Sequence, residues 1–102
     1  MLKDNIKFDS KKEAMFYVKY KQLLKAGKIT KLVLQPSFTL QEKFIDHLGE
    51  NHRAIKYVAD FSFIENGKLV VVDVKGFKTD IYKLKKKLLL FKYDGEFEFR
   101  EV

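Results

Sequence analysis

The dipeptide Asn66-Gly67 lies between two runs rich in β-branched and aromatic residues, at positions 54–65 and 68–75. A two-residue type I′ turn needs positive φ at both central positions, and Asn-Gly tolerates this conformation unusually well. The sequence therefore predicts a β-hairpin whose register is fixed by the turn, with Glu65 opposite Lys68.

The same register predicts a cluster of charges at the open end of the hairpin. Asp60 should face Asp73, with Cβ atoms roughly 4.5–5.5 Å apart, and Lys75 should project from the same face. Opposed carboxylates destabilise a sheet unless something neutralises them, so a divalent cation bridging the two acids is one interpretation. The alternative is an ion pair of Asp73 with Lys75 at the rim and a bend capped by Asp60.

A first helix is predicted over residues 11–26. Ser10 and Glu13 fit a capping box, and Gly27 stands where a left-handed residue commonly ends a helix. Glu13 falls on the apolar face of this helix, pointing toward the core. Its capping role and a role in a site are compatible.

The remaining pattern predicts a single α/β domain spanning residues 1–102. Strands are expected at 29–34 and 37–44, a loop at 45–53, one strand over 54–65, and a final strand at 96–102. A second helix should begin at Thr79 or Asp80 and end near Lys92, with its apolar positions on one stripe and lysines on the rest of its surface. That stripe consists of Ile81, Leu84, Leu88 and Phe91.

Composition narrows the chemistry. The 102 residues include no cysteine and two histidines, which excludes disulfides, thiolate metal sites and a cysteine nucleophile. Any metal should be held by oxygen, which favours Mg²⁺ or Mn²⁺. Neither a signal peptide nor a membrane span is expected from the apolar pattern, so the expected location is the cytoplasm.

The net charge of +7 is unevenly distributed. Seven lysines lie within residues 75–92 against one acid, Asp80, which suggests a surface that meets a polyanion. A solvated basic face is the alternative. The lysines best placed to contact a phosphate backbone are Lys78, Lys83, Lys86 and Lys87.

These parts resemble the PD-(D/E)XK nuclease superfamily, through Glu13, Asp60 and the run Asp73-Val74-Lys75. The stretches FDSKKEA, LQPSF, YVADFSF and VVVDVKGFKTDIYKLKKK are similar to phage and prophage proteins regarded as Holliday-junction-resolvase-like endonucleases. Ala59 replaces the proline of the superfamily motif, and Asp73 replaces the more usual glutamate. The resemblance implies a restriction-endonuclease-like αβββαβ core, with a mixed central sheet flanked by helices.

The resemblance also implies residue roles. Asp60, Asp73 and the Val74 backbone carbonyl would be metal ligands, and Glu13 would bind metal directly or through water. Lys75 would be the catalytic lysine. Gln35 corresponds to a glutamine near the active site of related nuclease subunits, although a glutamine before Pro36 can also simply end a strand.

The expected function is Mg²⁺-dependent hydrolysis of DNA phosphodiesters by an endonuclease selective for DNA structure. The expected partners are branched or duplex DNA and a second copy of the chain in a homodimer, with Phe97, Phe99 and the edge strands as candidate contacts. No membrane and no small-molecule cofactor is expected, and a phage-encoded protein would act in the host cytoplasm. Two alternatives remain: an inactive nucleic-acid-binding domain of nuclease fold, and a basic module that binds an acidic protein.

Overall fold

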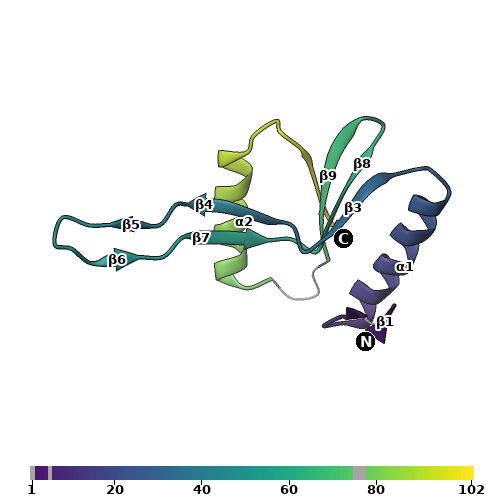
Figure 1. Cartoon of the computed structure of the whole chain (residues 1–102), viewed down its shortest axis with the longest axis horizontal. Helices are drawn as coiled ribbons and strands as arrows, with labels where there is room; N and C mark the ends of the chain where they lie inside the picture. The colour runs from purple at the N-terminus through teal and green to yellow at the C-terminus, as the bar shows by residue number, and fades with distance from the viewer. Residues whose placement is uncertain (1, 5, 75–77) are drawn as a thin grey trace.

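The computed structural model describes residues 2–4, 6–74 and 78–102, and shows a mixed α/β fold with two helices (Figure 1). A four-stranded sheet has the order β10-β9-β8-β3. Its strands are β3 (Thr30–Leu34), β8 (Phe61–Glu65), β9 (Lys68–Asp73) and β10 (Glu98–Glu101). The helices are α1 (Lys11–Lys25) and α2 (Asp80–Lys92). The shorter strands are β1 (Leu2–Lys3), β2 (Ile6–Lys7), β4 (Ser37–Gln41), β5 (Phe44–Ile45), β6 (Asn51–His52) and β7 (Ile55–Val58).

The central sheet has a core on each face. Along β9, alternate side chains point to opposite faces: Val70 and Val72 pack with the residues of α1, whereas Val71 packs with Leu89 of α2. β9 runs antiparallel to β8 and parallel to β10, because α2 carries the chain back across the sheet. The continuous run of valines is therefore explained by burial on both faces.

The predicted hairpin is confirmed. Asn66 and Gly67 have φ of 53° and 75°, and Glu65 pairs with Lys68 as the turn requires. The ladder ends at the pair Phe61–Val72, one position before Asp60 and Asp73. The sequence had predicted that the two acids form a regular backbone pair, and they do not.

The predicted first helix is also confirmed, ending one residue earlier than expected. The Ser10 hydroxyl accepts a hydrogen bond of 3.1 Å from the Glu13 N–H, and Gly27 has φ of 75°. These local signals position the helix so that Glu13 is buried against the sheet.

The segment between β3 and β8 forms a projecting β-arm, residues 37–58, which the sequence did not predict (Figure 1). The expected strand over 37–44 is divided into β4 and β5, and the expected loop over 45–53 contains paired strands β5 and β6. The expected strand over 54–65 is divided between β7, which pairs with β4, and β8, which joins the central sheet. The arm contributes to the longest extent of the molecule, 54 Å.

Helix α2 begins and ends as predicted, with the Thr79 hydroxyl accepting from the Tyr82 N–H. Its apolar stripe does not face the sheet: Ile81, Leu84, Leu88 and Phe91 are all exposed. The face toward the sheet instead carries Leu89, which is fully buried, with Tyr82 and Tyr93 packed beside it. Each tyrosine hydroxyl has an acceptor there, so these aromatic residues can be buried without loss of hydrogen bonding.

Candidate functional site

The predicted carboxylates come from three separate elements. Glu13 lies in the first turn of α1 and is 8% exposed, and Asp73 ends β9 and is fully buried. Asp60 stands in the bend between β7 and β8 and is half-buried. A buried carboxylate is costly unless it is hydrogen-bonded, paired with a positive charge or bound to a metal, so the groups around these acids determine the chemistry of the site.

Backbone groups hold Asp60 in place. Its carboxylate accepts a hydrogen bond of 2.6 Å from the Val74 N–H, just past the end of β9. Its own N–H donates to the Val72 carbonyl at 3.1 Å, and its carbonyl accepts from the Gln35 N–H at 2.9 Å. Asp60 thus connects the ends of β3 and β9, and its side chain reaches Asp73 although the ladder stops before this pair.

The electrostatics show that the three acids act on one another. Burial, hydrogen bonding with Asp73 and, to a smaller extent, the charges of Asp73 and Glu13 together raise the pKa of Asp60 to about 7. The Val74 N–H acts in the opposite direction. A carboxyl surrounded by like charges resists ionisation, and a bound cation would remove that resistance.

An open cleft of about 330 Å³ lies over Glu13 and Asp60. Gln35, predicted as a tentative site residue, lines the same cleft. Its φ of 51° is in the left-handed region, which is strained for a residue with a side chain and is common at functional sites. Lys7 also lines this cleft, and sequence reasoning missed it because one lysine among many carries no local signal.

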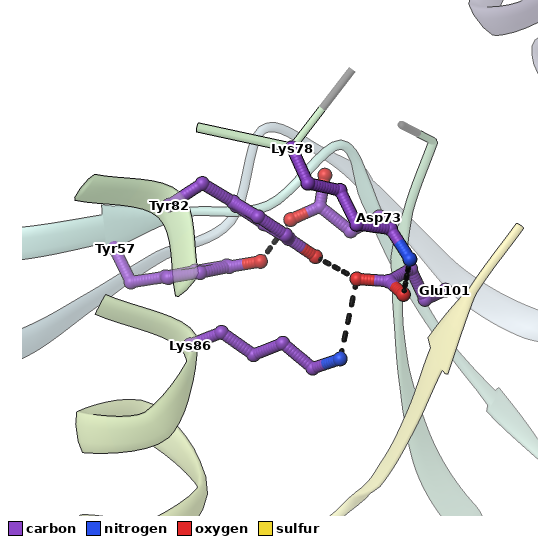
Figure 2. Close-up of polar contacts among 6 residues, drawn as sticks. All are labelled: Tyr57, Asp73, Lys78, Tyr82, Lys86 and Glu101. Carbon is purple, nitrogen blue, oxygen red and sulfur yellow. Dashed lines mark hydrogen bonds and ion pairs between the residues drawn. The ribbon is translucent and has the colours of Figure 1, made fainter. Parts of the chain in front are cut away.

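Two neighbouring groups of hydrogen bonds lie at Asp73 and at Glu101 (Figure 2). The Tyr57 hydroxyl donates to Asp73 Oδ2, and the Tyr82 hydroxyl donates to Glu101 Oε2. The two tyrosine rings lie 6.1 Å apart. Burial and the bond to Asp73 raise the pKa of Tyr57, so this hydroxyl remains a donor at neutral pH.

Glu101 also holds two of the four predicted DNA-binding lysines. Its carboxylate lies 2.7 Å from Lys78 Nζ and 3.2 Å from Lys86 Nζ. The hydrogen bonds from Lys78 and Tyr82 lower the pKa of Glu101 to about 2. The sequence signal for Glu101 was its alternation with Phe97 and Phe99, which are half-buried and pack against the core on the α2 side of the sheet.

The four predicted lysines line one pocket of about 300 Å³ together with Tyr82 and Glu101. Lys83 and Lys87 are exposed, whereas Lys86 is partly covered through its contact with Glu101. The structure therefore brings together all four of these cations: Lys78, Lys83, Lys86 and Lys87. Lys75, the predicted catalytic lysine, lies outside the described residues.

A second group of possible metal ligands lies at the end of the β-arm. Ligand atoms of Asp46, Glu50 and His52 are all within 4.8 Å of one another, so these residues could hold a metal ion. Asp46 Oδ2 is 2.9 Å from His52 Nε2, and Asp46 Oδ1 already accepts from the N–H groups of Leu48 and Glu50. The sequence had favoured oxygen ligands alone, and this group adds a histidine nitrogen.

The two helices and the comparisons with known proteins add three findings. Neither α1 nor α2, the helices of the part that the structure describes, has the length and apolar character needed to cross a bilayer. A comparison with curated proteins finds no match. A family model covers almost the whole sequence, residues 1–101, and the chain belongs to that family, described as "Protein of unknown function (DUF1064)".

Proposed function

We propose that this protein is a metal-dependent endonuclease that hydrolyses phosphodiester bonds in DNA. The observation that carries the proposal is the convergence of Glu13, Asp60 and Asp73 at one edge of the sheet, where burial and the two neighbouring acids raise the pKa of Asp60. Three acids kept so close are costly for stability unless they bind something positive. The element order α1-β3-β8-β9-α2-β10, with the β-arm inserted after β3, is compatible with the expected restriction-endonuclease-like core.

The residues present fit Mg²⁺ or Mn²⁺. These ions prefer carboxylate and carbonyl oxygen ligands, and Asp60, Asp73 and Glu13 offer carboxylates beside the backbone of Val74. Each of the other predicted ligands acts on Asp60. Val74 donates a hydrogen bond to its carboxylate, and Asp73 and Glu13 raise its pKa. When bound, the cation would neutralise these acids and supply Lewis-acid activation of water and phosphate.

The chain's own groups position the ligands. The Val74 N–H orients the Asp60 carboxylate, and the Tyr57 hydroxyl orients the Asp73 carboxylate (Figure 2). These hydrogen bonds fix two ligand oxygens before any ion binds, which lowers the cost of organising the site. Lys75, by the resemblance, would stabilise the negative charge that develops on the attacked phosphate.

The lysine pocket supports DNA as the substrate. Lys83 and Lys87 are exposed and could contact phosphate oxygens without first breaking an ion pair, whereas Lys78 and Lys86 would have to leave Glu101. Such contacts give affinity without reading sequence, and each one steepens the salt dependence of binding. The arrangement favours recognition of DNA by its shape and backbone.

Cleavage of labelled four-way junctions, flaps and linear duplex in Mg²⁺, Mn²⁺ or EDTA tests the proposal. The wild-type chain should cleave at least one substrate only with metal, and Asp60→Asn and Lys75→Ala should lower the rate by at least about 100-fold. Asp46→Asn is the matched control, because it removes an acid from the other possible metal group at the arm.

The outcomes separate the alternatives. Cleavage that is retained in Asp60→Asn but lost in Asp46→Asn would indicate that the catalytic metal binds at the β-arm, and this result would contradict the proposal. DNA binding without cleavage in either metal would favour an inactive nucleic-acid-binding domain. No DNA binding at low salt would favour the basic protein-interaction module.

A further inference from the structure

A second basic pocket lies between the base of the β-arm and helix α2, and its two lysines have no role in the site described above. The pocket has a volume of about 280 Å³. Neither of its lysines was predicted to contact phosphate, because the pocket forms only where β7 lies beside α2. We call it the arm pocket, and its lining includes Lys56, Tyr57 and Val58 of β7 and Ile81, Tyr82 and Lys85 of α2.

The arm pocket carries positive charge that its own lining does not neutralise. Lys85 is half-buried and Lys56 is exposed, and within the part of the chain that the structure describes neither forms an ion pair. None of the described residues that line the pocket is acidic. The lysine pocket differs, because Glu101 already pairs with two of its cations. Two ammonium groups around one small pocket repel each other, and a bound anion would remove this repulsion.

The arm pocket also has apolar walls. Val58 is 54% exposed and Ile81 is 67% exposed, although both are large aliphatic residues. Lys56 and Val58 are two positions apart in a strand and so share one face of β7. Ile81 and Lys85 are four positions apart and so share one face of α2. Each side of the pocket therefore contributes one lysine and one aliphatic residue.

This pairing of charge with apolar surface suits a nucleotide that is not base-paired. The lysines can bind its phosphate, and the aliphatic side chains can contact its sugar and the face of its base. In duplex DNA the faces of the bases are stacked on one another, so Val58 and Ile81 would find no base to contact. An unpaired strand exposes these faces.

The arm pocket adjoins both parts of the proposed nuclease site. Tyr82 lines the arm pocket on one side and the lysine pocket on the other. Tyr57 also lines the arm pocket, and its hydroxyl donates to Asp73, a proposed metal ligand (Figure 2). A DNA strand that leaves the lysine pocket can thus enter the arm pocket beside Tyr82, one tyrosine side chain away from the proposed metal site.

We propose that the arm pocket binds an unpaired nucleotide of a branched DNA substrate while the lysine pocket holds the adjoining duplex. This inference rests on the proposed function for the choice of DNA, and it narrows the substrate class to flaps and forks, in which a duplex meets a single strand. A four-way junction with all its bases paired would fill the lysine pocket alone.

Fluorescence anisotropy of the full chain in EDTA, with a flap, a four-way junction and a linear duplex of matched sequence, tests the inference. The wild-type protein should bind the flap most tightly. Lys85→Gln and Ile81→Ser should each weaken binding of the flap at least about fivefold more than binding of the duplex.

Two substitutions on the same helix are the matched controls. Lys83→Gln removes a cation from the lysine pocket and should weaken binding of all three probes by a similar factor. Phe91→Ser removes an apolar side chain that is 85% exposed and does not line the arm pocket, so it should change none of them. Thermal unfolding of Ile81→Ser should match the wild type, because this side chain is largely exposed.

The outcomes separate this inference from the nuclease activity. Equal losses for flap and duplex in Lys85→Gln, or an unchanged preference for the flap in Ile81→Ser, would overturn the inference even if the protein cleaved DNA with Mg²⁺. A preference for the flap that depends on Lys85 and Ile81 would support it even if no metal produced cleavage, because binding in EDTA needs no catalysis.

Discussion

Replacing Asp60 with asparagine should stabilise the metal-free protein at alkaline pH. The folded protein raises the pKa of this carboxyl from 3.8 to about 7, so folding favours its protonated form. The protonated carboxyl contributes its full stabilisation below about pH 4, and this contribution is lost as the pH rises through about 7. Asparagine keeps an oxygen for the Val74 N–H and has no charge to lose.

The pKa difference sets the size of the effect. About three units correspond to roughly 4 kcal/mol, which is an upper limit because neighbouring groups relax when Asp60 ionises. For a domain of about 100 residues, even half of this value shifts the midpoint of thermal unfolding by about 8 °C or more. The wild-type chain should lose stability as the pH rises from about 4 to about 7, and Asp60→Asn should lose much less.

Thermal unfolding followed by circular dichroism, from pH 4.5 to 8.5 with and without Mg²⁺, measures both effects. Mg²⁺ should raise the wild-type midpoint at pH 8 and leave Asp60→Asn nearly unchanged, because ligand binding to the native state alone is stabilising. Asp46→Asn is the control: hydrogen bonding with His52 lowers the pKa of Asp46, so its loss should be neutral or slightly destabilising. A gain in Asp60→Asn that is equal at pH 5 and pH 8 would refute the reasoning.

Three further substitutions test other parts of the site. Lys83→Ala should weaken DNA binding and reduce the slope of log K against log salt by about 1, whereas Lys43→Ala on the β-arm should change neither in a titration by fluorescence anisotropy. Glu101→Gln should tighten DNA binding several-fold at low salt, because it releases Lys78 from an ion pair of 2.7 Å; weaker binding would contradict this role. Gln35→Gly should raise the free energy of unfolding by up to about 1 kcal/mol in urea titrations, because glycine adopts φ of 51° without strain, while it lowers cleavage. A loss of stability would show that the Gln35 side chain supports the fold.

Local conformational rules explain what could be predicted from the sequence. Asn66-Gly67 specifies its turn through the φ angles of two residues, so the register of β8 and β9 was predictable almost to its end. Ser10 and Thr79 begin the two helices through hydrogen bonds that span three residues. Such signals depend on near neighbours and are preserved wherever the segment is placed.

The residues around Asp73 illustrate what local rules miss. Tyr57 reaches Asp73 from β7, where the β-arm returns to the sheet, and Glu101 meets Lys78 and Lys86 from the last strand. Each side chain is an ordinary member of its own strand or helix. Their roles arise from contacts between elements that are far apart in the sequence.

The sequence by itself determined the hairpin, the two helices and the presence of acids at the open end of β8 and β9, because backbone geometry and side-chain periodicity act over a few residues. Only the tertiary structure decided that the strand expected over residues 54–65 divides at Asp60, and that the more apolar stripe of α2 faces outward. The physical reason for the second outcome is that Tyr82, Leu89 and Tyr93 fill the space beside the sheet with hydroxyls that find acceptors there. Periodicity identifies the faces of a helix, but the shape and polarity of the surface beneath it select which face is buried.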